Sequence, residues 1–338
     1  MSRKLNFLGC QMKRVLSFVS SCLLVLLSCQ SQLSDSLSTD VPINKKVPLF
    51  KDTHVYFGKD ANFRNIESSV ELPELSNSYD TALLTVDLNC PNQKCDWWDR
   101  SGNLSLRDDS GRVYELMRFK TPYRVGATWV LDISDFLPLL NGRKKFGLFI
   151  DTWVGPGHPQ GDGWLVSADL VFTKEGRARK AVEVIPVFDP SNVRYGDPHT
   201  EAMLSATVES GRGYKSARLR SYVTGHGQGN SENCAEFCPK NHTFSFGESD
   251  QTVLVWRDNC DQTVTKGTQK GTWIYSRAGW CPGDKVDPVI LDIENLPHGS
   301  IPISWKPEPY INDYDGEYDG NQNTPPYYMI STYLILYR

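Results

Sequence analysis

The sequence predicts an all-β protein made of two antiparallel sandwiches packed side by side. Helical periodicity is nearly absent, apolar residues alternate or run in short β-branched and aromatic stretches, and 26 Gly and 20 Pro among 338 residues supply frequent turns. Ser134–Leu140 is expected to form a short turn of helix. The expected strands include Thr81–Leu88, Phe146–Trp153, Trp164–Phe172, Ala181–Val187, Ala217–Val223, Thr252–Trp256, Val289–Ile293 and Tyr327–Tyr337.

A polar, charged stretch divides the chain. Lys174-Glu-Gly-Arg-Ala-Arg-Lys180 lies between two strand-like runs and has the composition of a linker. We therefore expect one sandwich domain over residues 48–176 and a second over residues 181–338, each of ordinary domain size. A ligand cleft between the two domains is a natural consequence of that architecture.

The N-terminus has the pattern of an export signal over residues 1–28. Lys13-Arg14 precedes the apolar run 15–27, which is too short for a membrane span but has the length of a signal-peptide core. The run ends in Leu-Leu-Ser-Cys29, which resembles a bacterial lipobox, so we expect a periplasmic or cell-surface lipoprotein with lipid on Cys29. An ordinary cleaved signal with an incidental cysteine is the alternative. Residues 29–47 are expected to form a polar tether.

Charge and motif content limit the partners. The formal net charge is −4; removing the leader's four basic residues leaves 32 basic and 40 acidic residues, a net charge of −8. That balance argues against nucleic acid or an anionic membrane, so membrane contact is expected only through the lipid, and a monomer is expected. No phosphate-binding glycine motif, nucleophile elbow or zinc-protease motif occurs. The acidic loop Asp313–Gly320 does not match the EF-hand pattern, and calcium binding there stays open.

The nine cysteines sort into three in the leader and six in the rest of the chain. An even number in an exported chain implies disulfides, for which six cysteines allow fifteen pairings. A zinc site fits poorly, because neither short pair has the usual two-residue gap and no histidine pair follows at ligand spacing. Spacing suggests the pairs Cys90–Cys95, Cys234–Cys238 and Cys260–Cys281.

The first candidate site is Cys90-Pro-Asn-Gln-Lys-Cys-Asp-Trp-Trp-Asp-Arg100. Three charges beside two indoles suit neither a core strand nor a solvated loop, so a stapled loop that presents acids beside aromatic faces is expected. A disulfide-closed turn with surface acids is an equally good interpretation of this stretch alone. Further candidates, each with a structural alternative, are His226 and Glu236 in 225–238, Arg277 and Trp280 in 276–283, and Asp151 in 149–153.

Taken together, these segments resemble the bacterial peptide-N-glycosidase F family. The resemblance covers roughly residue 80 to the C-terminus, and five motifs occur in the family's order with closely similar spacing. The motifs are Cys90–Arg100, Arg118-Phe-Lys-Thr-Pro-Tyr123, Asp151-Thr-Trp153, Cys234-Ala-Glu-Phe-Cys238 and Arg277-Ala-Gly-Trp-Cys-Pro-Gly283. No single motif would suffice, but five in order, accounting for all six cysteines outside the leader, are specific.

The resemblance implies two jelly-roll sandwiches and an amidase that hydrolyses the bond between asparagine and the innermost N-acetylglucosamine of N-linked glycans. The substrates would be N-glycosylated proteins or glycopeptides, Asn would become Asp, and no cofactor or metal is implied. The family's essential acid falls on Asp99, its second acid on Glu236 and its motif arginine on Arg277. Asp96 is expected to order the loop that carries Asp99. The expected catalytic residues are Asp99, Glu236 and Asp151, and the expected substrate contacts are Arg100, Arg277, Trp98, Trp153, Trp280 and His226.

The chain departs from the family pattern around the sugar. The family's best-known member has Glu where this chain has Asp151, and its Ser-Gly-Trp-Gly-His reads Thr224-Gly-His-Gly-Gln228, which replaces an indole. The shorter acid leaves more room beside the innermost sugar, so we hypothesise tolerance of core α1,3-fucose. Two alternatives remain: a non-catalytic glycan- or glycoprotein-binding surface lipoprotein, and an endo-acting glycosidase that cuts the chitobiose core with the same two acids.

Overall fold

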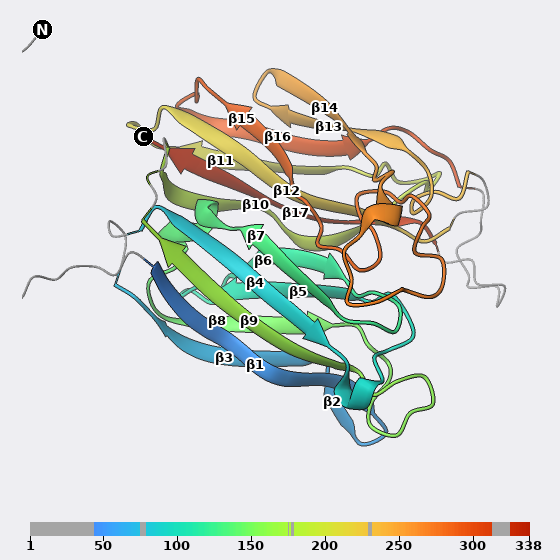
Figure 1. Ribbon diagram of the computed structural model, residues 1–338. Helices are drawn as coiled ribbons and strands as arrows, with labels where there is room; N and C mark the ends of the chain where they lie inside the picture. The colour runs from blue at the N-terminus through green and yellow to red at the C-terminus, as the bar shows by residue number, and fades with distance from the viewer. Residues whose placement is uncertain (1–43, 75–78, 175, 177–178, 229–231, 313–324) are drawn as a thin grey trace, which may run out of the picture. The chain divides into compact units, whose positions relative to one another are not determined.

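A computed structural model describes residues 44–74, 79–174, 176, 179–228, 232–312 and 325–338. Their strands form four antiparallel sheets that pair into two sandwiches, one from residues 44–173 and the other from residues 181–337 (Figure 1). The all-β fold of two side-by-side antiparallel sandwiches is therefore confirmed. The predicted helical turn is also present, as the 3₁₀ helix η2 (Ser134–Leu139).

The first sandwich packs a five-stranded sheet of order β2-β1-β9-β4-β7 against a four-stranded sheet of order β3-β8-β5-β6. Burial alternates along its strands; in β4 the side chains of Ala82, Leu84, Val86 and Leu88 are buried, because one face of the sheet lies on the core. The strands are β1 (Asn44–Gly58), β2 (Ala61–Phe63), β3 (Asn65–Leu72), β4 (Thr81–Asn89), β5 (Ser101–Arg107), β6 (Val113–Lys120), β7 (Ala127–Asp132), β8 (Gly142–Ile150) and β9 (Trp164–Thr173).

The second sandwich pairs a sheet of order β10-β17-β12-β15 with a sheet of order β11-β16-β13-β14. Its core gathers large side chains from both sheets, among them Leu219, Phe244, Trp305 and Ile330. The strands are β10 (Ala181–Arg194), β11 (Leu204–Ser210), β12 (Ser216–His226), β13 (Lys240–Phe246), β14 (Ser249–Val255), β15 (Val289–Ile293), β16 (Gly299–Pro307) and β17 (Tyr327–Tyr337). Two more 3₁₀ turns are η1 (Pro91–Gln93) and η3 (Cys260–Gln262).

Strand β17 explains how the sandwiches meet. Tyr328, Ile330, Leu334 and Leu336 face the core of the second sandwich, whereas Tyr333, Ile335 and Tyr337 pack on the core of the first. A strand buried on both faces reads as a continuous apolar run rather than an alternation, which matches the sequence of β17. The apolar run in this strand therefore forms part of the joint between the sandwiches.

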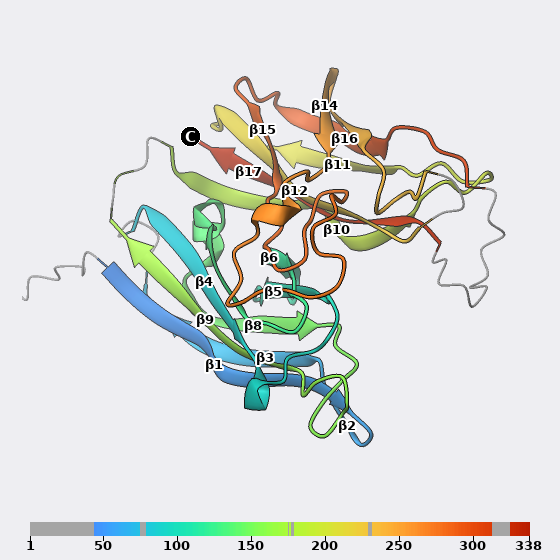
Figure 2. The same cartoon turned by 45° about the vertical axis from the view of Figure 1, so that its right-hand side comes forward.

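The long segment between β14 and β15 covers the edges of the first sandwich. Backbone groups of Gly283 and Val286 bond to Lys120 and Arg118 on edge strand β6, and Lys266 bonds to Gly126 beside edge strand β7. In Figure 2 this segment, drawn in orange, lies across the junction of the two sandwiches. Covering an edge satisfies its open backbone groups and blocks pairing with other chains.

A buried group of charges ties the sandwiches together away from these loops. Asp135 of η2 is 2% exposed and accepts hydrogen bonds from Tyr337 at 2.9 Å, from Arg218 at 3.3 Å and from Arg220 at 3.4 Å. We call these four residues the interior ion cluster. Arg218, at its edge, also bonds Asp292 at 3.0 Å.

Some expectations about the termini and loops meet no described residue. The signal segment, Cys29 and the acidic loop Asp313–Gly320 lie outside the described residues. Strand β1 begins at Asn44, so residues 44–47 belong to the first strand rather than to the expected tether. The domain boundaries 48–176 and 181–338 stay a prediction. Within the described part of the chain, no helix has the length and apolar character needed to cross a membrane.

Candidate active site

The loop that follows β4 is fixed by Asp96. The Cys90–Cys95 disulfide closes its base, and the fully buried Asp96 carboxylate accepts hydrogen bonds from the Trp98 amide at 3.0 Å, the Arg100 guanidinium at 2.8 Å and the Thr152 hydroxyl at 2.7 Å. With its oxygens occupied in this way, Asp96 is a structural residue, as expected. It holds the loop on both sides of Asp99.

Asp99 is the carboxylate that this loop leaves accessible. Its side chain is 17% exposed, and its Oδ2 lies 3.9 Å from Nη2 of Arg277, which belongs to the second sandwich. The Tyr123 hydroxyl lies 3.2 Å from the Thr272 hydroxyl and opposes the upward shift in the pKa of Asp99. The two acids of the motif therefore differ: Asp96 is fully hydrogen-bonded within the first sandwich, whereas Asp99 is partly exposed and faces Arg277 of the second sandwich.

Glu236 contacts the same arginine, Arg277, from the loop that follows β12 of the second sandwich. It sits in the ring closed by Cys234–Cys238, and its Oε1 accepts from Nε of Arg277 at 3.2 Å. The ring lies directly against β12, because Gly225 has no side chain: a Cβ there would meet the Ala235 carbonyl oxygen at 2.4 Å. Backbone bonds from Glu236 to Gly227 and from Ala278 to Glu236 complete the attachment.

Arg277 joins the two acids. Its side chain is 1% exposed, and besides both carboxylates it donates to the carbonyl oxygens of Tyr275 at 2.7 Å and Thr272 at 3.1 Å. The guanidinium stacks over the rings of Phe237 and Trp280 at 5.1 and 4.8 Å. Such a fully bonded planar cation has one available orientation, so it sets the positions of both carboxylates.

Burial shifts the protonation of the two acids. Burial raises the pKa of Asp99, against the opposing effects of Arg277, Lys120 and Tyr123. Burial also raises the pKa of Glu236 to about 7; Arg277 opposes this shift and the charge of Asp99 adds to it. Two interacting carboxyl groups with raised pKa values can divide acid and base roles near neutral pH.

Lys120 is a site residue that the sequence analysis did not single out. It ends β6, is 3% exposed, and interacts electrostatically with Asp99 and Glu236. The sequence signal that was available is the spacing of Lys120 from Arg118, because residues two apart on a strand share a face. In the structure, Arg118 on that face bonds to Thr224 and Met329 of the second sandwich. We call Asp99, Glu236, Lys120 and Arg277 the site cluster.

Asp151 and Trp153 form a rim just outside the site cluster. The Asp151 side chain is 46% exposed and pairs with Arg64 at 3.2 Å, and Arg64 lies over the Trp153 ring at 4.2 Å. Trp153 is 51% exposed and Trp98 is 48% exposed, so both indoles are available to a ligand. Arg64, which the sequence analysis also missed, orients this rim.

Three expected substrate contacts are placed otherwise. Trp280 is 3% exposed, with its indole nitrogen bonded to the Gly225 carbonyl oxygen, and His226 is 6% exposed and stacked on Trp280. Both lie beneath the site cluster and cannot offer a face to a sugar, which corrects their expected role. Arg100 bonds to Asp96 and so orders the loop. Sequence could not distinguish a buried indole from an exposed one.

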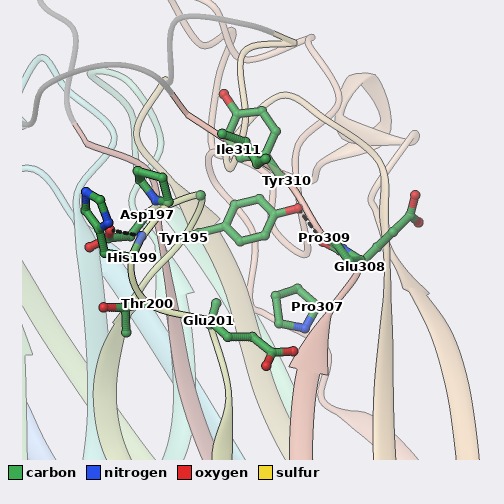
Figure 3. A pocket seen from close by; sticks show the side chains of 13 residues that line it. Tyr195, Asp197, His199, Thr200, Glu201, Pro307, Glu308, Pro309, Tyr310 and Ile311 are labelled. Atoms are coloured by element: carbon green, nitrogen blue, oxygen red, sulfur yellow. Dashed lines mark hydrogen bonds between the residues drawn. The ribbon is translucent and has the colours of Figure 1, made fainter.

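A cavity of about 370 Å³ lies elsewhere, on the second sandwich between β10 and the end of β16 (Figure 3). The Tyr195 ring at its wall is 2% exposed and its hydroxyl bonds to the Glu308 carbonyl oxygen. Asp197 at its edge pairs with Arg194. The cavity contains no residue of the site cluster.

Comparison with known proteins agrees with this geometry. Residues 194–335 match the family model described as peptide-N-glycosidase F, C terminal. The chain is 27% identical over 289 residues to peptide-N(4)-(N-acetyl-beta-D-glucosaminyl)asparagine amidase F of Elizabethkingia miricola, covering 80% of this chain and 78% of that protein.

Solved structures extend the likeness to both sandwiches. The structure of PNGase F, a glycosylasparaginase from Flavobacterium meningosepticum, superposes with a TM-score of 0.78 at 25% identity, covering 87% of this chain and 96% of that one. PNGF-II shares the fold, with a TM-score of 0.68 at 19% identity over 87% of this chain and 65% of that one. With two jelly-roll sandwiches and matches over both of them, the chain is similar to peptide-N-glycosidase F in sequence and in fold.

Proposed function

We propose that this protein is an amidase that hydrolyses the bond between asparagine and the innermost N-acetylglucosamine of N-linked glycans. The observation that carries the proposal is the site cluster: Asp99 from one sandwich and Glu236 from the other are held on a single buried arginine, Arg277. Similarity to peptide-N-glycosidase F supports the same activity. Glycoproteins or glycopeptides are the substrates.

The chemistry divides between the two acids. Glu236, whose pKa lies at about 7, accepts a proton from the water that attacks the side-chain carbonyl carbon of asparagine. Asp99, whose pKa is raised, donates a proton to the amide nitrogen as the carbon–nitrogen bond breaks. The products are an aspartate side chain and a glycosylamine. Arg277 compensates the charge on the acids and on the tetrahedral oxyanion.

The rim supplies contacts to the sugar. Trp153 and Trp98 expose indole faces of the kind that stack on sugar rings, and Asp151 presents a carboxylate beside Trp153. The Tyr327 ring lies 5.2 Å from the ring of His226, and both Glu236 and Asp151 raise its pKa in addition to the larger effect of burial. Asp151 is therefore a substrate-orienting acid at the outer edge of the site.

Mass spectrometry of a treated glycopeptide tests the proposal. Conversion of the glycosylated Asn to Asp, with one heavy oxygen atom taken from heavy-oxygen water, is the expected result. A single N-acetylglucosamine left on asparagine would identify a glycosidase of the chitobiose core instead. An unchanged peptide that remains bound to the protein would identify a glycan-binding module. Either of these results overturns the amidase.

The fucose hypothesis concerns Asp151. Because Asp151 is held back by Arg64 at 3.2 Å and is shorter than glutamate, we propose that the space beside the innermost sugar admits core α1,3-fucose. Glycopeptides with and without that fucose form a matched pair, and both should be cleaved. Asp151→Glu should slow cleavage of the fucosylated peptide alone. Complete resistance of the fucosylated peptide in the wild type would refute the hypothesis.

We propose further that the protein acts as a lipid-anchored monomer outside the cytoplasm. Its three disulfides suit an oxidising compartment, and Cys29 follows the apolar leader at the lipobox position. Cys29→Ser should release the protein from the membrane fraction without loss of specific activity. Retention in the membrane fraction would rule out the lipid anchor, and sedimentation of the released protein measures the oligomeric state.

A further inference from the structure

Lys120 occupies an unusual place for a lysine. Its ammonium group donates to the Ser101 hydroxyl, lies 3.4 Å from Nδ1 of His226 and sits 4.3 Å over the Trp280 ring. The residue is 3% exposed. A lysine withdrawn from water to this extent requires compensation by fixed partners, and the partners here come from both sandwiches.

The histidine beside it is arranged as an acceptor. Nε2 of His226 lies 2.8 Å from the Thr224 hydroxyl, which leaves Nδ1 toward Lys120. Burial lowers the pKa of His226 well below its usual value, and the positive charges of Lys120 and Arg118 lower it further. A neutral imidazole with Nδ1 unprotonated accepts a hydrogen bond from the ammonium. The Thr224-Gly-His-Gly-Gln228 loop thus provides a partner for Lys120.

Charge in the site cluster explains what Lys120 does. The charged groups that interact with it are Asp99 and Glu236, which attract it, and Arg118 and Arg277, which repel it. Arg118 has its own bidentate partner, since Nε and Nη2 bond to Glu115 at 2.8 and 2.7 Å. The Lys120 ammonium and the Arg277 guanidinium lie over the same Trp280 ring, at 4.3 and 4.8 Å. Because Arg277 also bonds to Glu236 at 3.2 Å, both cations lie beside the carboxylate that must stay ionised to act as a base.

We propose that Lys120 is a positioning residue of the amidase, whose ammonium keeps Glu236 ionised so that Glu236 can accept a proton from water. The proposal rests on the proposed function and adds a third ionisable group to its site. Burial lowers the pKa of Lys120 to about 8, against the raising effect of both acids, so the group is charged at neutral pH. Lys120 in turn lowers the pKa of Glu236.

The test is the pH dependence of kcat/KM on one glycopeptide, measured for the wild type, Lys120→Met and Lys120→Arg. Without the ammonium, the ascending limb of the pH profile of kcat/KM should move to higher pH by about one unit. At pH values below the limb, kcat/KM should then be about tenfold lower than in the wild type. This difference should shrink toward about pH 9. Arginine retains the charge, so Lys120→Arg should keep the limb near its wild-type position. Lys144→Met removes another strand lysine, paired with the exposed Asp109, and should leave the limb in place.

Each outcome decides the proposal. A uniform loss across the pH range in Lys120→Met, with the limb unmoved, would show that Lys120 only supports the fold. If Lys120→Met does not fold, Lys120→Gln retains a polar partner for Ser101 and is used in its place. Absence of Asn-to-Asp conversion by the wild type at every pH would instead refute the proposed function, which separates the two failures.

Discussion

Two groups of buried charge join the same pair of sandwiches, and they differ in how completely their acids are bonded. In the interior ion cluster, Asp135 is 2% exposed and accepts from Arg218, Arg220 and Tyr337. In the site cluster, Asp99 and Glu236 are each 17% exposed and share Arg277. Completely bonded acids stabilise a joint, whereas acids with an accessible side and raised pKa values are available for chemistry.

The difference indicates why the site cluster, and not the interior ion cluster, is the candidate active site. Buried charges at the interior ion cluster close the joint between η2, β12 and β17, whereas the site cluster draws its acids from the loops that follow β4 and β12. Those loops can then carry incompletely compensated acids, whose cost in folding free energy is offset by the interior ion cluster and the cores. The comparison predicts opposite responses to neutralising an acid in each cluster.

The largest effect is expected at Arg277. Arg277→Met removes the cation between both acids and leaves the Thr272 and Tyr275 carbonyl oxygens without their donor, so kcat/KM should fall about a thousandfold or more. Arg277→Lys restores a charge but not the planar set of bonds, and should recover activity only in part. Steady-state kinetics on a glycopeptide measures both. Full activity of Arg277→Lys would contradict the positioning role.

Neutralising the interior acid should damage the fold instead. Asp135→Asn leaves Arg220 buried without an anionic partner and should cost about 3 kcal/mol of unfolding free energy. Urea denaturation measures the loss. The folded fraction should keep a kcat within about threefold of the wild type, because the site cluster is untouched. A specific loss of kcat would mean that the two clusters are coupled.

Neutralising a site acid should stabilise the protein at alkaline pH. The pKa of Glu236 is raised from 4.5 to about 7 in the folded state, so the cost of ionising it is absent below pH 4.5 and fully present above pH 7. Glu236→Gln should therefore gain up to about 3 kcal/mol at pH 8, with no gain at pH 4. Denaturation at both pH values is the measurement. Destabilisation at pH 8, as expected for Asp135→Asn, would erase the distinction between the clusters.

The smallest effect separates exposed from buried indoles. Trp153→Ala removes a half-exposed ring from the rim and should raise KM about tenfold with little change in Tm. Trp280→Ala empties a buried position and should cost about 3–5 kcal/mol of stability. Kinetics and thermal denaturation of the two variants make a matched comparison. Equal stability losses would place Trp153 in the fold rather than at the rim.

Much of the architecture could be predicted from the sequence. Alternation in strands such as Thr81–Asn89 reflects a sheet with one face on a core, and the cysteine spacings match the disulfides of the structure. The acids Asp99 and Glu236 came from a resemblance between motifs, and the structure brings both to Arg277. The separation of Asp96 from Asp99 followed from the same reading and agrees with the bonds of Asp96.

The rest depends on contacts between the sandwiches. Arg118 and Lys120 look like the solvated face of an edge strand, yet both are buried, as is Glu115, because the second sandwich covers β6. Trp280 and Trp153 both lie in candidate site motifs, but Trp280 is buried and Trp153 is half-exposed. This difference also depends on which segments pack against each indole. Periodicity reports whether a side chain faces its own sheet's core, but it contains no information on what docks against the outer face.

The most direct test compares one acid from each cluster in one assay. The rate of Asn-to-Asp conversion per folded molecule is measured for Asp99→Asn and Asp135→Asn beside the wild type. Asp99→Asn should lose activity on the order of a thousandfold while being at least as stable as the wild type, and Asp135→Asn should keep activity while losing stability. Near-normal conversion by Asp99→Asn would contradict the assignment of the chemistry to the site cluster.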